Sequence, residues 1–168
     1  MKKWLLFMTL SLLVLTACGS GDETSGTVSE PAEQKHVEEE VKLKTTLDVE
    51  QQENQLIFTL RLYNESLRDL TLPFGSGQQF EIVVKDEQGE EVYRYSADKM
   101  FTMALQMIEL KAGDKMEWLE TWDLSSHDVP EGTYTVEAEV MVLLKSDELP
   151  VEIDPEQLHA KQTIEISR

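Results

Sequence analysis

The stretch Leu56-Ile57-Phe58-Thr59-Leu60-Arg61-Leu62 decides the fold, because Leu56, Phe58, Leu60 and Leu62 place large apolar side chains at every second position. Successive side chains of a strand point to opposite faces of a sheet, so this period of two predicts a strand with one buried face. The same alternation recurs at residues 80–84 and, more weakly, at 43–49 and 163–166. It also recurs at Val136, Ala138, Val140, Val142 and Leu144.

Turn-forming residues separate these runs, at positions 52–54, 73–77, 86–89, 111–114 and 130–132. Short strands at intervals of roughly 8 to 12 residues, with no helix-length pattern between them, predict two packed antiparallel sheets. The expected fold class is therefore all-β, an immunoglobulin-like antiparallel β-sandwich.

Two segments depart from the alternation. Residues 99–108 place Met100, Met103, Ala104 and Met107 at helical spacing, which predicts either a short helix or an irregular crossover. Residues 145–157 are acidic and contain prolines, and we expect a long surface loop there.

The N-terminus has the organisation of a bacterial export signal. Lys2 and Lys3 precede an apolar run over residues 5–15, which is shorter than the roughly 20 residues of a membrane-spanning helix. The following Leu15-Thr16-Ala17-Cys18 resembles a lipobox. This resemblance implies that the Cys18 sulfur receives a diacylglyceryl group and that residues 1–17 are then removed.

Cys18 is the single cysteine of the chain, so no intramolecular disulfide can form. Lipidation gives this thiol a use, and two acyl chains hold a protein stably at a membrane without a spanning helix. We therefore expect a lipoprotein anchored on the extracytoplasmic face of the bacterial membrane.

The charge of the chain is strongly acidic. The sequence has 15 Lys and Arg against 33 Asp and Glu; without Lys2 and Lys3 the balance is 13 − 33, or −20. This charge opposes binding of nucleic acid and repels anionic lipid headgroups. Residues 18–40 are polar and acidic, which predicts a disordered tether, and residues 41–168 are expected to form one domain.

Catalytic and metal-binding patterns are weak, so we expect no enzyme and no cofactor. The histidines are His36, His127 and His159, and none has a nucleophile motif beside it. Gly75-Ser76-Gly77 is too short for a nucleophile elbow. Residues 86–90 fit a hairpin turn better than a calcium loop. A helix over 99–108 would align three methionine thioethers for Cu(I), but methionine also fills gaps in cores. Trp118 and Trp122 share strand parity and are expected to pack together inside the sandwich.

One ordered series of motifs runs through about residues 56–142. Its parts are Leu60-x-Leu-x-Asn64, Phe74-Gly75-Ser76-Gly77-Gln78-x-Phe80, Val83-x-x-Asp86-x-x-Gly89-x-x-Val92-Tyr93-Arg94-Tyr95-Ser96, Met100-Phe101-Thr102-x-Ala104-Leu105, Leu110-x-x-Gly113, Trp118, Trp122-Asp123 and Gly132-Thr133-Tyr134. This series resembles the BsuPI-type intracellular proteinase inhibitor domain. The resemblance implies an immunoglobulin-like sandwich that inhibits a serine protease by binding. Because this chain carries an export signal, its target is expected outside the cytoplasm.

The resemblance supplies no contact residues, so the candidates come from loops that the sandwich can support on both sides. These loops span residues 74–79 and 96–104, and the candidate partner-binding residues are Phe74, Gly75, Ser76, Gly77, Gln78, Ser96, Asp98 and Lys99. In a purely structural role, Gly75 and Gly77 would adopt positive backbone dihedrals while Phe80 and Phe101 fill the core. The alternative function is a non-inhibitory module for adhesion, assembly or sensing in the envelope.

Overall fold

The computed structural model describes residues 40–126, 128–144 and 152–167. The predicted signal peptide (1–17), the lipidation site Cys18 and the tether up to residue 39 lie outside the described residues, as do His36 and His127. Among the described residues, no helix has the length and apolar character needed to span a membrane.

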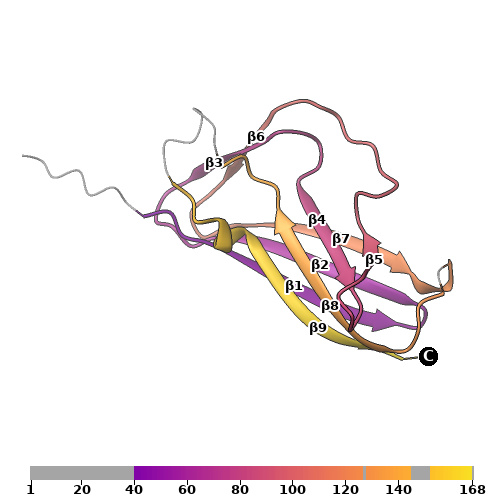
Figure 1. The fold of residues 1–168 in the computed structure, drawn as a ribbon. Coiled ribbons are helices and arrows are strands. Elements are labelled where there is room, and N and C mark those ends of the chain that lie inside the picture. Colours follow the sequence, from indigo (N-terminus) through magenta and orange to yellow (C-terminus); the bar gives the residue numbers. More distant parts are fainter. Residues whose placement is uncertain (1–39, 127, 145–151, 168) are drawn as a thin grey trace, which may run out of the picture. The chain divides into compact units, whose positions relative to one another are not determined.

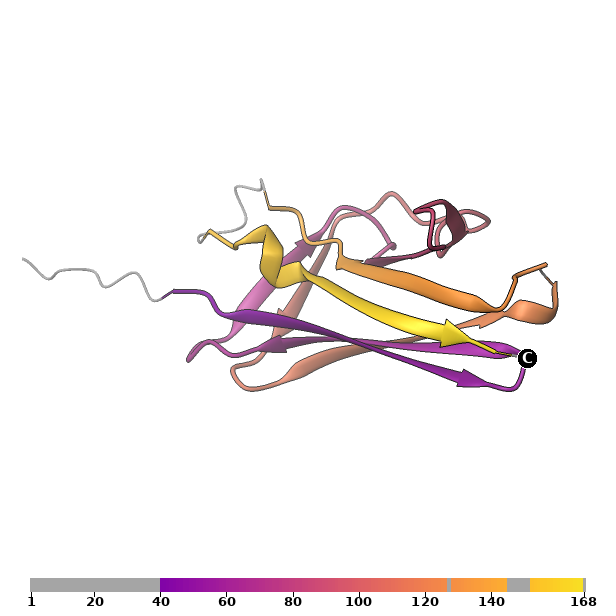
Figure 2. The ribbon, with the colours of Figure 1, turned by 60° about the horizontal axis from the view of Figure 1, so that its bottom comes forward.

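The described residues form antiparallel β-sheets in two layers (Figures 1 and 2). The first sheet has the order β1-β2-β7, with bounds β1 (Leu43–Gln52), β2 (Gln55–Asn64) and β7 (Lys115–Asp123). The second has the order β5-β4-β8-β9, with bounds β5 (Glu91–Arg94), β4 (Phe80–Lys85), β8 (Gly132–Val140) and β9 (His159–Ile166). A separate pair joins β3 (Leu70–Phe74) to β6 (Gln106–Leu110). Two 3₁₀ helices, η1 (Leu124–Ser126) and η2 (Pro155–Leu158), lie in the connections.

The strand order is that of an immunoglobulin-like sandwich. β1, β2 and β7 take the places of strands A, B and E, and β5, β4, β8 and β9 take those of C′, C, F and G. Tyr134, near the start of β8, donates its hydroxyl to the carbonyl of Pro130 at 2.8 Å, which is the tyrosine corner of such domains. The predicted fold class is confirmed.

The core forms as the alternation of apolar residues predicts. Leu56, Phe58, Leu60 and Leu62 of β2 are each at most 1% exposed. They face the alternate residues of the opposite sheet, among them Ile82, Val84, Val136 and Val140. Leu144 departs from the expected pattern: β8 ends at Val140, and Leu144 is exposed to solvent.

The short helix considered for residues 99–108 is wrong, and the irregular crossover is confirmed. Residues 99–105 contain no helix, and β6 begins at Gln106. Tertiary contacts override the helical spacing, because Phe101 packs against Tyr95 and Gly77 donates its amide to the carbonyl of Thr102.

The surface loop expected at 145–157 is correct only in part. Residues 145–151 lie outside the described residues. Ile153 is buried, and η2 begins after Asp154, whose carboxylate accepts a hydrogen bond from the amide of Glu156. Leu158 at the end of η2 is also buried, so this part of the segment contributes to the core.

Three connections meet at one end of the sandwich: β3 to β4, β5 to β6, and the chain that follows β8. Gly77 binds Thr102 through its amide, and the amide of Met141 binds the carbonyl of Gln79 at 2.9 Å. The amide of Leu143 binds the carbonyl of Pro73 at 2.8 Å. We call residues 74–79 and 96–105 together the two-loop surface.

Candidate protein-binding surface

The two loops that the sequence singles out lie side by side. The amide of Gly77 donates to the carbonyl of Thr102 at 2.8 Å. A Cβ atom at Gly77 would lie 2.8 Å from Thr102 Oγ1, so a larger residue at position 77 would require the Thr102 side chain or the loops to shift. The structure therefore joins segments that are far apart in the sequence into one surface.

The role expected for the loop glycines in a purely structural reading is wrong. Gly75 and Gly77 are absent from the positive-φ glycines of the described residues, which are Gly89, Gly113 and Gly132. They lie in close contact with other segments instead: a Cβ at Gly75 would meet the Leu143 side chain at 3.2 Å. Glycine here allows two segments to approach and does not serve an unusual dihedral.

Some of the candidate partner-binding residues support the loops from the core, and others are accessible at the surface. Phe74 is fully buried at the end of β3, so it supports the loop from beneath and cannot itself contact a partner. Ser76, Gly77, Gln78, Ser96 and Lys99 are half-buried, whereas Gly75 and Asp98 are exposed.

Glu81 fastens both loops to the sheet, although the sequence gives no sign of this role. Its carboxylate accepts hydrogen bonds from the Ser96 amide at 3.1 Å, from the Ser96 hydroxyl, and from Gln78 Nε2 at 3.1 Å. The guanidinium of Arg94 lies 3.6 Å away, and the Glu81 side chain is 14% exposed. Glu81 lies on the outward-facing side of β4, so the sequence pattern predicts only a surface residue. The two loops cover it only in the folded domain, and the local sequence does not indicate this.

Aromatic rings carry the second loop. Tyr95 stacks on Phe80 with ring centroids 4.2 Å apart, and Phe101 packs against Tyr95 at 5.9 Å. Phe80 is buried and Phe101 is half-buried, so both have the packing role expected of them. Lys99 Nζ lies 3.7 Å from the centroid of the Tyr95 ring and 2.8 Å from the Glu120 carboxylate.

The two tryptophans of β7 face inward but do not pack on each other as expected. Trp122 stacks on Tyr93 at 4.8 Å, whereas Trp118 lies against Phe80 at 5.7 Å and donates Nε1 to Gln79 at 2.9 Å. Residues four apart on a strand are separated by roughly 13 Å, which is too far for ring contact. Trp118 thus joins the support of the two-loop surface.

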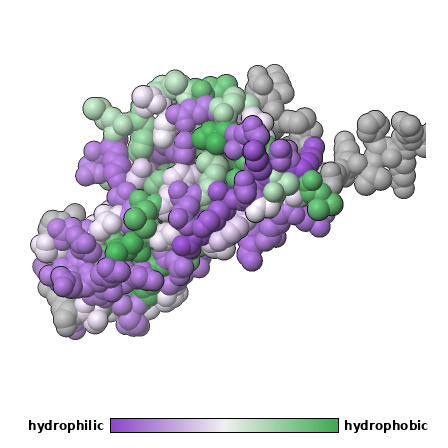
Figure 3. All heavy atoms as spheres, turned by 180° about the vertical axis from the view of Figure 1, so that it is seen from behind, coloured by the Kyte–Doolittle hydropathy of each residue, from purple (hydrophilic) through white to green (hydrophobic). Residues whose placement is uncertain are grey.

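Exposed apolar side chains gather at this end of the domain. Met100, Met103 and Leu105 are 99%, 89% and 55% exposed, and Leu143 and Leu144 are each 39% exposed. In Figure 3, green and pale-green atoms follow the upper edge, where Figure 1 shows the segment between β5 and β6. Such an apolar patch with a polar rim is typical of protein-binding surfaces.

Comparison with known proteins identifies the family. The chain matches the family described as "BsuPI: Intracellular proteinase inhibitor" over residues 43–144, which is more than half of its length. The chain belongs to the BsuPI family. The resemblance seen in the motifs is confirmed, and the matched range includes the whole two-loop surface.

Several solved structures match the BsuPI domain at low similarity. The CARDB domain of a Pyrococcus furiosus protein has 12% identity and a TM-score of 0.42, over 76% of this chain and 89% of that domain. β-Glucosidase 3B of Thermotoga neapolitana has 15% identity and a TM-score of 0.41, and the match covers 76% of this chain and 16% of the enzyme. The Kluyveromyces marxianus β-glucosidase has 9% identity and a TM-score of 0.40, over 76% of this chain and 14% of that enzyme. These likenesses carry no inference about function. No curated protein matches the chain.

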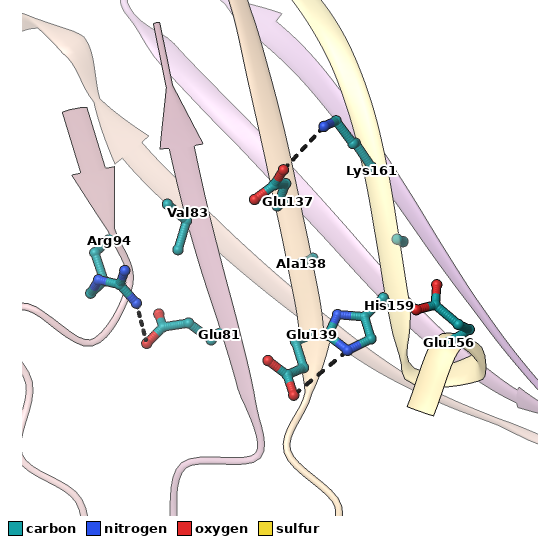
Figure 4. A pocket seen from close by; sticks show the side chains of 10 residues that line it. Glu81, Val83, Arg94, Glu137, Ala138, Glu139, Glu156, His159 and Lys161 are labelled. Atoms are coloured by element: carbon teal, nitrogen blue, oxygen red, sulfur yellow. Dashed lines mark hydrogen bonds and ion pairs between the residues drawn. The ribbon is translucent and has the colours of Figure 1, made fainter. Parts of the chain in front are cut away.

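The BsuPI domain also has a groove of about 390 Å³ on the outer face of the second sheet (Figure 4). Several of its polar side chains lie against one another: Arg94 against Glu81 at 3.6 Å, Lys161 against Glu137 at 3.1 Å, and His159 Nε2 against Glu139 at 3.8 Å. A hydrogen bond from Lys85, followed by one from Lys161, holds the pKa of Glu137 below its ordinary value. Because several of these polar groups already have partners within the groove, the groove is a weaker candidate than the two-loop surface.

The geometry assumed for a copper site is wrong for the BsuPI domain. Without a helix, Met100, Met103 and Met107 do not share a helical face, and Met107 belongs to β6. Residues 86–90 form the hairpin turn between β4 and β5, in which Asp86 accepts hydrogen bonds from the amides of Gln88 and Glu90. The described residues contain no cluster of three His, Cys, Asp or Glu side chains placed to hold a metal ion.

Replacing Gly77 by alanine is expected to lower the free energy of unfolding by about 1 kcal/mol, because the Thr102 side chain or the loops must shift to admit the new methyl group. A Gly77→Ala/Thr102→Ala double variant should recover most of the loss, since it removes Thr102 Oγ1 and the next Thr102 atom lies 3.5 Å away. Urea denaturation measures both. A single variant as stable as the native protein would show that the close approach is not required.

The stability of the domain should fall at high pH because Tyr93 and Tyr95 pack in their neutral forms. Burial, and secondly the Glu120 charge, raise the pKa of Tyr93 and of Tyr95 above the ordinary value of about 10. A raised folded-state pKa gives stability that is complete below the unfolded pKa and is lost as the pH rises toward the folded one. Urea midpoints should therefore fall as the pH rises above about 10. The urea midpoint of Tyr93→Phe should fall less over the same range. An identical fall in the variant and the native protein would show that Tyr93 does not cause the loss of stability.

Proposed function

We propose that this chain is a lipid-anchored, extracytoplasmic protein whose BsuPI domain inhibits a proteinase by binding to it. The observation that carries the proposal is the match of residues 43–144 to the inhibitor family. The domain acts as a binding protein and not as an enzyme, and it needs no cofactor for this role. A secreted or surface serine protease is the proposed partner.

The two-loop surface supplies what inhibition by binding requires. An inhibitor must occupy the protease cleft without being cut productively, so its contact segment has to be held rigidly. Here Glu81 and the Tyr95 ring support the second loop, and the Gly77 amide ties it to the first. The loops are then already ordered in the free domain, so little further conformational entropy is lost when the protease binds.

The position of the surface in the fold supports a binding role. The connections before β4, after β5 and after β8 take the places of the loops before strand C, after C′ and after F. In antibody variable domains the loops at this end of the sandwich bind antigen. Fold alone does not assign function, but it shows that this end can present loops on a rigid frame.

The cellular location is proposed from the sequence. The export signal and the lipobox-like Leu15-Thr16-Ala17-Cys18 support attachment outside the cytoplasm through Cys18. The polar residues that follow would hold the domain away from the bilayer, and the acidic charge favours this separation. A target in contact with this domain must itself lie outside the cytoplasm.

Titration of secreted subtilisin-type proteases with the purified full-length protein tests the proposal. Stoichiometric loss of proteolytic activity, with the inhibitor recovered intact from the mixture, is the expected result. Unchanged activity across the panel, or progressive cleavage of the protein, would favour the alternative of a non-inhibitory envelope module.

A further inference from the structure

Met100 is the most exposed of the large apolar side chains in the described part of the chain, at 99%. Exposure alone says little, because single apolar side chains on a protein surface are common. The way in which the neighbouring residues are held makes Met100 distinctive.

Both neighbours of Met100 are fixed on the same aromatic ring. Lys99 Nζ lies 3.7 Å from the centroid of the Tyr95 ring, and the Phe101 ring packs against Tyr95 at 5.9 Å. Tyr95 in turn stacks on the buried Phe80. The backbone of Met100 is therefore held on both sides while its own side chain remains in solvent.

Hydrogen bonds fix the rest of this segment. The amide of Ala97 binds the carbonyl of Arg94 at 3.2 Å, and the amide of Lys99 binds the carbonyl of Ser96 at 3.3 Å. After Met100, the carbonyl of Thr102 accepts the Gly77 amide. An exposed side chain on such a pre-ordered segment can bind with little further loss of conformational entropy.

We propose that Met100 is the anchor residue that enters the specificity pocket of the target, and that the target is a protease with an apolar pocket. This inference rests on the proposed function and names its contact residue and target class. A hydrophobic slot accepts a long, uncharged side chain, whereas a pocket with an acidic base selects Lys or Arg. The nearest cation, Lys99, is already paired with Glu120 at 2.8 Å, so the loop presents no free basic residue beside Met100.

Met103 is the matched control on the same segment. It is 89% exposed, close to the value for Met100. It belongs to a run, residues 102–105, in which every side chain is exposed. Its neighbours Thr102 and Ala104 cannot make the ring contacts that hold Lys99 and Phe101, so Met103 is less firmly placed than Met100 and replacing it should have a smaller effect.

The test compares full-length Met100→Lys, Met100→Leu and Met103→Lys with the native protein against a subtilisin-type and a trypsin-type protease. Met100→Lys should raise the inhibition constant for the subtilisin-type enzyme by about 30-fold or more, as expected for an anchor residue. It should also gain inhibition of the trypsin-type enzyme. Met100→Leu and Met103→Lys should remain within about 5-fold of the native protein, as expected away from the anchor.

The outcomes separate this inference from the proposed function. If the native protein inhibits and Met100→Lys inhibits equally well, Met100 is not the anchor and the proposed function stands. A larger loss in Met103→Lys than in Met100→Lys would also overturn the inference. If the native protein inhibits neither enzyme nor any other member of the panel, the proposed function fails and the anchor fails with it. Equal thermal midpoints for all variants establish that they fold alike.

Discussion

Replacing Phe58 by alanine is expected to lower the free energy of unfolding by about 3 to 5 kcal/mol. Phe58 is 0% exposed at the centre of β2, where its ring stacks against Tyr93 with centroids 5.8 Å apart. Truncation leaves a cavity between the two sheets and removes the ring on which Tyr93 packs. Domains typically have only about 5 to 15 kcal/mol of stability, so this variant should be close to unfolding.

Urea denaturation of Phe58→Ala measures the loss, and Leu67→Ala is the matched control. Leu67 is also a large apolar residue, but it is 86% exposed, so its truncation should change stability by no more than about 0.5 kcal/mol. Equal effects of the two substitutions would mean that the Phe58 side chain is not buried between the two sheets as described.

The second large effect is expected at the N-terminus. Replacing Cys18 by alanine should transfer the protein from the membrane fraction to the soluble fraction or the medium, because the thioether to lipid can no longer form. Cell fractionation and incorporation of labelled fatty acid measure this directly. The domain itself should fold unchanged, since Cys18 precedes the described residues.

Continued membrane association of Cys18→Ala would contradict lipid anchoring. So would the presence of the native protein free in the cytosol. Only the second result would place the target inside the cell, and neither would affect the membership of the domain in the inhibitor family.

The strands were predictable because burial imposes a period of two on the sequence. Phe58, Ile82 and Val136 each stand in an alternating run, and each is at most 1% exposed. The turn at Gly89 was predictable for a local reason as well, since its φ of +83° suits glycine. Local patterns of this kind require no knowledge of the partner strand.

The support of the site could not be predicted, because it depends on contacts between distant segments. Glu81 has the parity of a surface residue, yet it holds Ser96 and Gln78. Gly77 lies beside Thr102 only after the sandwich has formed. The methionine spacing at 99–108 favours a helix when only local sequence is considered. The contact between Phe101 and Tyr95, which opposes a helix, forms only in the folded domain.

Hydrogen exchange of the full-length chain, alone and bound to an inhibited protease, tests the central claim most directly. If the two-loop surface binds the target, amide exchange should slow in residues 74–79 and 96–105 and remain unchanged in the β4–β5 turn at 86–90. Slower exchange along the outer face of β8 and β9, with none in the two loops, would contradict the account.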